Sequence, residues 1–284
     1  MSQLLFQDGQ FYRDDKMVVG ASSRALRYGD GLFETMKVNR DTIQLGDYHM
    51  QRLFDALHLL EFELPSHINP SYFLDRILQL VHRNGHGKLA RIRLMVFRGN
   101  GGLYDPENHY PHHIIQSWSL PEANHHWNEN GLVIGIHDKA RKSMDILANS
   151  KTNNYLPYIM GALEAKNQKW NDALILNNAG RISDSTIANV FLVSGNKITT
   201  PALEEGCVAG IMRRYLLEKL KANNRDVQEI AILPADLENA DEVFLTNSTY
   251  GIRWVKSIGN KNYTANLSLE LYHLFIKPLF GITE

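Results

Sequence analysis

The spacing of apolar residues in the second half of the chain switches repeatedly between the period of a strand and that of a helix. Residues 132–136 and 173–176 are short apolar runs that are typical of buried strands. Between them, residues 156–163 place apolar side chains at helical spacing. Strands that alternate with helices form a sheet with helices packed on it. We therefore expect this half to combine a sheet with helices.

The first half of the chain carries the same two kinds of pattern. Asp8 and Gly9 lie between two apolar runs and predict a hairpin turn. Periodicity then predicts two strands over residues 33–38 and 91–97, and two helices over residues 47–60 and 71–82. We expect Asp47 to cap the first helix, because its carboxylate can accept from the free N–H groups there.

A domain boundary is expected near the middle of the chain. The 284 residues are 44% hydrophobic, which is enough for a sizeable core and argues against disorder. Residues 116–130 are polar and have little periodicity, so we place a linker there. This division leaves a small N-terminal domain over residues 1–115 and a larger, cofactor-binding C-terminal domain over residues 131–284.

Bulk properties exclude several classes of function. The formal net charge of -1 argues against a nucleic-acid or anionic-membrane partner. The single cysteine, Cys207, cannot form an internal disulfide and indicates a reducing compartment. The N-terminus has neither a basic region nor a long apolar run, so we expect no signal peptide and a cytoplasmic protein. The pair His112–His113 lacks the spacing of a metal site, and we expect no metal.

Lys151 is the first candidate for chemistry. It stands between a polar, turn-rich run and the helical pattern that starts at Leu156. The N-terminus of a helix carries a partial positive charge, so a lysine beside that end would lose its proton more easily. A neutral lysine amine can attack a carbonyl group and form a Schiff base. The alternative is an ordinary surface lysine, and this stretch alone does not decide between the two.

Other residues would suit a charged small molecule. Arg52 lies on a predicted helix and matches phosphate geometry, although most such arginines are simply solvated. Gly210 precedes a predicted helix whose first N–H groups would suit a phosphate, and residues 246–249 end a strand with hydroxyl and amide groups. Asp184 lies just before a buried-looking strand and is either a turn residue or the partner of a cation, such as a cofactor nitrogen.

Together these features resemble the class IV aminotransferase family, the pyridoxal-phosphate enzymes of the branched-chain and D-amino-acid aminotransferase fold. The resemblance covers nearly the whole chain and rests on segments that occur in one order: 29–35, 49–53, 151 with 154–156, 184–191, 210–213 and 245–248. It implies an α+β two-domain fold of type IV. The small N-terminal domain would be an α/β sandwich, and the larger C-terminal domain would be β-barrel-like with helices.

The resemblance also implies the residues that hold the cofactor. Lys151 would carry pyridoxal 5'-phosphate as a Schiff base and would later move a proton. The cofactor phosphate would be bound by Arg52, by the backbone N–H groups of Ile211 and Met212, and by the hydroxyl of Ser248.

Two positions depart from the usual pattern of the family. Asp184 matches the carboxylate that faces the pyridine nitrogen, which is usually a glutamate. The shorter side chain requires either a closer backbone or a weaker contact. Phe33 stands where several relatives carry a tyrosine that hydrogen-bonds near the cofactor, and phenylalanine cannot donate that bond.

The resemblance places the substrate near Phe33 and near a glycine-rich loop that carries Arg98, Leu103 and Tyr104. It further implies a homodimer in which Leu103 and Tyr104 reach the pocket of the neighbouring subunit. The alternative is that this loop covers its own subunit.

Three functions remain open. The first is a lyase similar to 4-amino-4-deoxychorismate lyase, which releases pyruvate and leaves 4-aminobenzoate. Met212, where transaminases of this fold tend to have threonine, favours it. The second is an aminotransferase for a branched-chain or D-amino acid, favoured by residues 154–156 after Lys151. The third is a non-catalytic binding protein, which the presence of both Lys151 and Arg52 disfavours.

Overall fold

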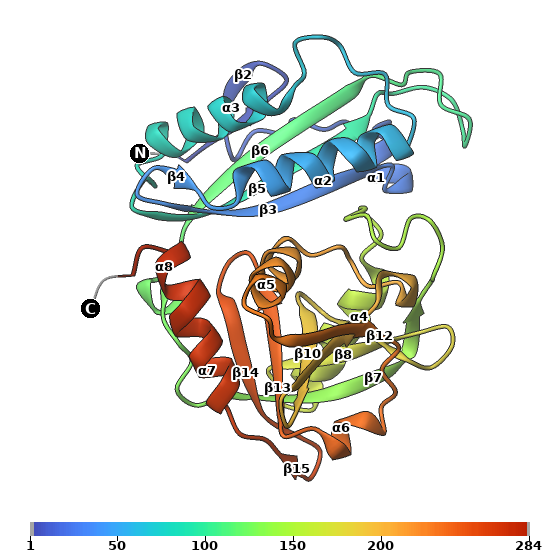
Figure 1. Ribbon diagram of the computed structural model, residues 1–284. Coiled ribbons are helices and arrows are strands. Elements are labelled where there is room, and N and C mark those ends of the chain that lie inside the picture. The colour runs from blue at the N-terminus through green and yellow to red at the C-terminus, as the bar shows by residue number, and fades with distance from the viewer. Residues whose placement is uncertain (1–2, 283–284) are drawn as a thin grey trace. The chain divides into compact units, whose positions relative to one another are not determined.

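The computed structural model describes residues 3–282, and the chain divides into two compact units. The first unit comprises residues 1–122 and 150–154, and the second comprises residues 123–149 and 155–284. Each unit has its own sheet and its own helices, which confirms the expected α+β two-domain class (Figure 1).

The division differs from the expected one at two places. The linker expected over residues 116–130 begins too early, because residues 116–119 are the end of strand β6 and pair with the neighbouring strand β5. Residues 150–154, which include Lys151, group with the first unit although they lie well beyond the end of the expected linker in the sequence. A sequence cannot signal this, because the grouping depends on contacts with a strand far away in the chain.

The first unit is built on an antiparallel sheet in the order β2-β1-β6-β5-β3-β4. Its strands are β1 (Leu4–Gln7), β2 (Gln10–Arg13), β3 (Gly31–Asn39), β4 (Thr42–Ile43), β5 (Leu89–Arg98) and β6 (Pro111–Ser119). The first two strands form the hairpin that Asp8 and Gly9 predict. The long strands β3 and β5 pair along their whole length, from Gly31 opposite Phe97 to Asn39 opposite Leu89.

Three helices belong to this sheet: α1 (Arg24–Tyr28), α2 (Gly46–Leu59) and α3 (Pro70–Arg83). Helix α3 starts at a proline, and the Asn69 side chain accepts a 3.0 Å hydrogen bond from the backbone N–H of Tyr72. The expected cap of α2 is wrong: Leu45 precedes this helix, and Asp47 lies within its first turn. Asp47 still favours the helix there through the helix dipole.

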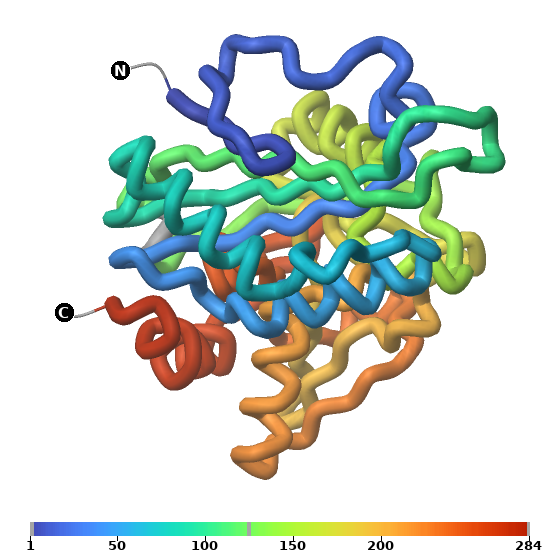
Figure 2. Tube along the Cα trace, turned by 90° about the horizontal axis from the view of Figure 1, so that it is seen from above, coloured from blue at the N-terminus to red at the C-terminus, as the bar shows by residue number. Residues whose placement is uncertain are grey.

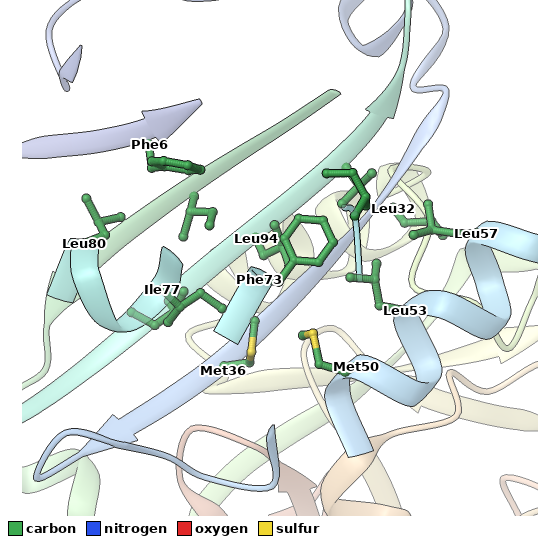
Figure 3. Close-up of a cluster of buried hydrophobic side chains, with 14 of the residues drawn as sticks. Phe6, Leu32, Met36, Met50, Leu53, Leu57, Phe73, Ile77, Leu80 and Leu94 are labelled. Carbon is green, nitrogen blue, oxygen red and sulfur yellow. The ribbon is translucent and has the colours of Figure 1, made fainter. Parts of the chain in front are cut away.

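The core of the first unit lies between the sheet and the helices α2 and α3, which run beside each other (Figure 2). Strand β3 alternates, so that Leu32, Met36 and Val38 point into this core. Figure 3 shows Met36 next to Met50 of α2, with Phe73 of α3 close by. Phe33 lies on the other face of β3, away from this core.

The second unit contains a nine-stranded mixed sheet in the order β12-β11-β10-β13-β14-β7-β8-β9, with β15 paired to β14. Its strands are β7 (Leu132–Lys142), β8 (Asp172–Asn177), β9 (Ile182–Ser185), β10 (Asn189–Ser194), β11 (Lys197–Pro201), β12 (Asp226–Ile230), β13 (Glu242–Asn247), β14 (Gly251–Ile258) and β15 (Lys261–Asn262). The pairs β11–β12, β14–β7 and β7–β8 are parallel.

The helices of the second unit are α4 (Leu156–Asn167), α5 (Ile211–Ala222), α6 (Asp236–Asn239), α7 (Asn266–Leu271) and α8 (Lys277–Leu279). Helix α4 is tied to β7 through the hydrogen bond between the His137 ring and the Glu164 carboxylate. Within residues 3–282, no helix combines the length and the apolar character that crossing a membrane would require.

Candidate active site

Lys151 is fixed by its backbone to strand β3. The N–H of Phe33 donates a 2.9 Å hydrogen bond to the carbonyl oxygen of Lys151. Thr152 forms an isolated bridge with Leu32, and the N–H of Asn153 donates to the carbonyl of Gly31 at 3.0 Å. Residues 151–153 therefore lie along β3 and share backbone hydrogen bonds with it. Lys151 does not lie at the N-terminus of a helix, where it was expected. Helix α4 begins only at Leu156, and the effect of a helix dipole fades within one turn.

The ammonium group of Lys151 stands over an aromatic ring. Its Nζ lies 4.4 Å from the centroid of the Phe33 ring, a distance typical of a cation–π contact. The guanidinium carbon of Arg93 lies 4.1 Å from the same centroid. Residue Arg93 comes from β5, where it pairs with Thr35. Sequence reasoning missed Arg93, because only the register of β3 and β5 brings it to Phe33.

Arg52, the expected phosphate ligand, contacts a buried carboxylate. Its Nε and Nη2 atoms donate to the two oxygens of Glu34 at 2.8 and 2.5 Å. The Nδ1 atom of His49 lies 2.6 Å from the same carboxylate. Glu34 and His49 are both buried, whereas the Arg52 side chain keeps 12% of its surface exposed. This arrangement holds the guanidinium plane in one orientation.

The contacts in this cluster shift the pKa of Glu34 and of His49. Burial raises the pKa of Glu34, but the charges and hydrogen bonds of Arg52 and His49 outweigh it and lower that pKa to about 2. Burial lowers the pKa of His49, although the neighbouring Glu34 opposes this effect. The cluster is thus a carboxylate anion that holds a guanidinium cation. Glu34 belongs to segment 29–35, which contributes to the family resemblance, but the alternation of β3 alone does not identify its partner.

The glycine-rich loop after β5 is held at its base by two buried arginines. Arg24 donates to the carbonyl oxygens of Gly101 at 3.1 Å and of Leu103 at 2.5 Å, and to the carboxylate of Asp30 at 2.8 Å. Arg98, which we expected to bind substrate, donates to Asp30 at 3.1 Å and to the carbonyl of Leu60 at 2.5 Å. Arg98 is only 6% exposed, and these hydrogen bonds hold its guanidinium against Asp30 and Leu60. A direct contact of Arg98 with substrate stays a prediction.

The tip of this loop has the opposite character. Leu103 and Tyr104 expose 69% and 87% of their surface. The Tyr104 ring lies 5.6 Å from the ring of Tyr28 on α1, measured between centroids. Two large apolar side chains at a fixed and exposed tip are suited to contact another molecule.

In the second unit, Asp184 lies within strand β9 and not in the polar turn that the sequence suggests. Its Oδ2 atom accepts from Lys142 Nζ at 2.9 Å, from the Tyr158 hydroxyl at 2.9 Å and from the N–H of Val208 at 3.1 Å. Its Oδ1 atom accepts from the Asn189 amide at 3.0 Å. The expected cationic partner is therefore present in the chain itself, as Lys142.

Sequence reasoning missed both Lys142 and Tyr158. Lys142 ends β7, whose pairing with β8 shifts register between His137 and Lys142. A shifted register changes which face a side chain occupies, so periodicity could not place it. Burial and the nearby Asp184 carboxylate raise the pKa of Tyr158 well above its ordinary value, so that it remains a hydroxyl donor.

The start of α5 suits a phosphate group. Gly210 precedes the helix, and among the described residues no side chain caps it. The first N–H groups of the helix therefore remain for an anion, which the helix dipole also favours. A Cβ atom on Gly210 would lie 1.8 Å from Asn189 Oδ1, so only glycine fits here. The glycine thus lets the Asn189 side chain approach the start of α5, and a phosphate at Ile211 and Met212 stays a prediction.

The end of β13 lies beside Asn189, the residue that contacts the start of α5. Asn189 pairs with Thr246 across the sheet, and Ser248 follows two residues later. Within the described chain, the buried hydroxyl of Thr246 has no hydrogen-bond partner. The second unit thus gathers Asp184, Asn189, the α5 start and the hydroxyl end of β13, as the order of motifs suggests.

Comparison with known proteins identifies the family. The sequence model described as Amino-transferase class IV matches residues 31–258. An aminodeoxychorismate lyase of Vibrio harveyi is 30% identical over 242 residues, which are 84% of this chain and 87% of that protein. A putative branched-chain-amino-acid aminotransferase of Methanocaldococcus jannaschii is 26% identical, over 86% of this chain and 84% of that protein.

A solved structure shows the same fold. The branched-chain aminotransferase of the thermophilic archaeon Thermoproteus uzoniensis, solved with norvaline, superposes with a TM-score of 0.89 at 21% identity. The match covers 100% of this chain and 97% of that one, and it confirms the expected type IV fold. The family model matches residues 31–258, which are most of the chain. The match to the Vibrio harveyi relative, at 30% identity, covers 87% of that protein. The chain therefore belongs to the class IV aminotransferase family.

Proposed function

We propose that this protein is a pyridoxal 5'-phosphate enzyme in which Lys151 binds the cofactor covalently. The observation that carries the proposal is the position of Asn189. Its amide nitrogen donates to Asp184 and to the carbonyl of Val208 at 2.9 Å, while its oxygen lies against Gly210. One side chain thus contacts both the Asp184 carboxylate, which would face the ring nitrogen, and the start of α5, which would bind the phosphate.

The remaining ligands follow from the same proposal. The backbone N–H groups of Ile211 and Met212, with the hydroxyl of Ser248, would bind the phosphate. Arg52 would add its charge, oriented by the two hydrogen bonds to Glu34. When bound, the cofactor withdraws electrons from the substrate carbon next to the reacting amine.

Lys151 would serve twice. Its amine first holds the cofactor, and a substrate amine then takes its place. The released Lys151 amine can take a proton from the substrate and return it. The backbone hydrogen bond from Phe33 keeps Lys151 close to β3 through this exchange, since it does not involve the side chain.

The substrate class that we favour is an aromatic-ring precursor such as aminodeoxychorismate. Removal of the proton on the ring carbon that bears the amine, with cleavage of the bond between the neighbouring ring carbon and the enolpyruvyl oxygen, would leave 4-aminobenzoate. A proton returned to the methylene carbon of the released enolpyruvate would give pyruvate. The Vibrio harveyi lyase, at 30% identity, supports this choice. So does Phe33, since an apolar wall without a hydroxyl suits a flat ring.

Amine transfer between amino acids and 2-oxo acids is the second candidate. The guanidinium of Arg93 beside the Phe33 ring would suit the carboxylate of an amino acid. The Methanocaldococcus jannaschii relative supports this candidate.

A paired reaction on cofactor-loaded protein tests the two candidates. One sample receives freshly made aminodeoxychorismate, and the release of 4-aminobenzoate and pyruvate is followed. The other receives L- and D-amino acids in separate reactions, and conversion of the cofactor to its amine form is followed by absorbance. Release of 4-aminobenzoate alone would support the lyase, and conversion alone would support amine transfer. If the protein acquires no visible absorbance with pyridoxal phosphate, the proposal fails as a whole.

We further propose that the enzyme is a homodimer. Helix α4 exposes an apolar stripe with helical spacing: Leu156 at 69%, Ile159 at 47%, Met160 at 46% and Leu163 at 50%. Such a stripe on a helix is suited to a partner surface. Light scattering should give twice the chain mass, and Leu163→Glu should reduce it. A wild-type mass of one chain would contradict the dimer.

The exposed tip at Leu103 and Tyr104 would then complete the pocket of the neighbouring subunit. Mixed dimers test this idea, with Lys151→Ala in one subunit and Tyr104→Ala in either the same or the other subunit. Activity should fall only when the Tyr104 change lies opposite the intact Lys151. A fall in activity only when the Tyr104 change lies in the same subunit as the intact Lys151 would instead support a loop that covers its own subunit.

A cytoplasmic location is the last part of the proposal. The chain has one cysteine, Cys207, and the fold buries it as a free thiol. Proteins of reducing compartments commonly keep such cysteines. Fractionation of cells that produce the protein, followed by detection with an antibody, would test the location.

A further inference from the structure

A buried lysine accompanies the carboxylate that we assign to the cofactor ring. Lys142 Nζ lies 2.9 Å from Asp184 Oδ2, and the two side chains expose 8% and 3% of their surface. Lys142 Nζ also lies 3.5 Å from the carbonyl oxygen of Ala148 and 5.2 Å from the centroid of the Tyr158 ring. The lysine is therefore held in place by several groups, all within the second unit.

The pair has electrostatic consequences for any cation that approaches Asp184. An isolated buried carboxylate attracts a nearby cation strongly, because little water screens it. A lysine on one of its oxygens cancels much of that attraction. The Tyr158 hydroxyl, the Val208 N–H and the Asn189 amide also donate to the carboxylate, but they carry no charge.

We propose that Lys142 is a positioning residue that shares Asp184 with the ring nitrogen of the cofactor and so weakens the hold of Asp184 on that nitrogen. The inference rests on the proposed pyridoxal-phosphate function and deepens it. It concerns how strongly the ring nitrogen is kept as a cation, and thus how strongly the bound cofactor withdraws electrons. Lys142 would thereby set how strongly the bound cofactor withdraws electrons.

A purely structural Lys142 would behave differently. If its charge only stabilised the fold around Asp184, removing it would loosen this region and weaken cofactor binding. If it competes with the ring nitrogen, removing it should strengthen cofactor binding. The sign of the change in affinity therefore separates the two roles.

The test compares dissociation constants measured by titrating apoprotein with pyridoxal phosphate. We expect Lys142→Met to bind about tenfold more tightly than wild type, because a charge at this distance changes a neighbouring ionisation by roughly that factor or more. Lys142→Arg retains the cation and should restore the wild-type value. Lys139→Met is the matched control: it removes an exposed lysine from the same strand and should change nothing.

A cofactor analogue shows whether the ring nitrogen is responsible. With 1-deazapyridoxal phosphate, which has carbon in place of that nitrogen, Lys142→Met and wild type should bind alike. If Lys142→Met folds poorly, Lys142→Gln supplies a neutral donor of smaller size, and the same order of affinities is expected.

Three results would overturn the inference. The first is that both neutral variants bind pyridoxal phosphate no more tightly than wild type. The second is that Lys142→Met gains as much affinity for the deaza analogue as for pyridoxal phosphate. The third is that Lys142→Arg does not return the affinity to the wild-type value, and any one of the three is sufficient. Failure of the proposed function looks different, since the wild-type protein would then bind no pyridoxal phosphate at all.

Discussion

The backbone N–H of Phe33 donates a 2.9 Å hydrogen bond to the carbonyl of Lys151, and the Lys151 ammonium stands 4.4 Å from the centroid of the Phe33 ring. A single residue of β3 therefore holds the lysine by its main chain and faces the amine with its side chain. The first contact survives most substitutions of Phe33, whereas the second depends on the aromatic ring.

Phe33→Leu should make Lys151 react faster with the cofactor. The ring stabilises the ammonium form by about 0.5–2 kcal/mol, and its loss makes the reactive neutral amine easier to reach. We expect the visible absorbance of apoprotein mixed with pyridoxal phosphate to rise roughly two- to tenfold faster at neutral pH. Phe33→Tyr keeps the ring and should react at the wild-type rate. Equal rates for Phe33→Leu and wild type would contradict this role of the ring.

Lys151→Ala should bind the cofactor without a covalent bond. Borohydride treatment of cofactor-loaded wild type should label the peptide that contains Lys151, and mass spectrometry should find no such label in the variant. Turnover should fall by about a thousandfold or more, as for other residues that act directly in chemistry. Lys139→Ala serves as the control. A variant with normal turnover would rule out the proposed chemistry.

Glu34→Gln should destabilise the protein by about 3 kcal/mol near neutral pH, because it leaves Arg52 without its buried carboxylate. The folded protein lowers the pKa of Glu34 from 4.5 to about 2. Its contribution to stability is therefore complete above pH 4.5 and is lost as the pH falls toward 2.

Urea denaturation of wild type and Glu34→Gln at several pH values measures this effect. The difference in the free energy of unfolding should stay constant from pH 7 to about pH 5 and should shrink below that. Glu63→Gln, an exposed glutamate of the same unit, is the control and should show no such difference. A difference that persists unchanged down to pH 3 would show that the charge of Glu34 is not responsible.

Gly210→Ala should weaken the binding of pyridoxal phosphate at least about tenfold. The new methyl group would lie 1.8 Å from Asn189 Oδ1, so either the start of α5 or the Asn189 side chain must move. Titration of the apoprotein measures the loss. Gly20→Ala is a suitable control, since a Cβ at Gly20 meets nothing within 4 Å. Wild-type affinity in Gly210→Ala would argue against a phosphate at this helix start.

Arg24→Gln should release the glycine-rich loop. The substitution removes the charged donor to the carbonyl oxygens of Gly101 and Leu103. Amide hydrogen exchange over residues 99–108 should become at least about tenfold faster, while exchange in β3 and β5 stays slow. Arg27→Gln changes an exposed arginine of the same helix and should leave the loop unchanged. Uniformly faster exchange in both variants would contradict a specific anchoring role.

Periodicity was a reliable guide to the long elements. The strands β3 and β5 and the helices α2 and α3 lie where the apolar spacing predicts them, because each buries one face against a sheet or helix. Helix α4 also lies where it was predicted, although the apolar side chains that predicted it are exposed. The α5 start and the polar end of β13 lie at the ends of elements, as predicted. Their roles in binding a cofactor stay predictions, and Lys151 lies along β3 and not at the start of a helix. The family resemblance depended on the order of these segments.

Several pairings lay beyond this kind of reasoning. Arg52 was predicted as an anion clamp, yet two of its nitrogens contact Glu34. Arg98 was predicted to contact substrate, which stays untested, and the sequence did not show that its side chain is buried against Asp30. In both cases the partner is far away in the sequence, and only the fold brings the two side chains together.

The sequence by itself determined the elements, the two-domain class and the order of the site residues along the chain, because local spacing and residue type control these properties. Only the tertiary structure decided that Lys151 lies along β3 and that Lys142 neutralises Asp184. Both contacts depend on strand register, and a shift of one residue would turn each side chain to the opposite face of its sheet.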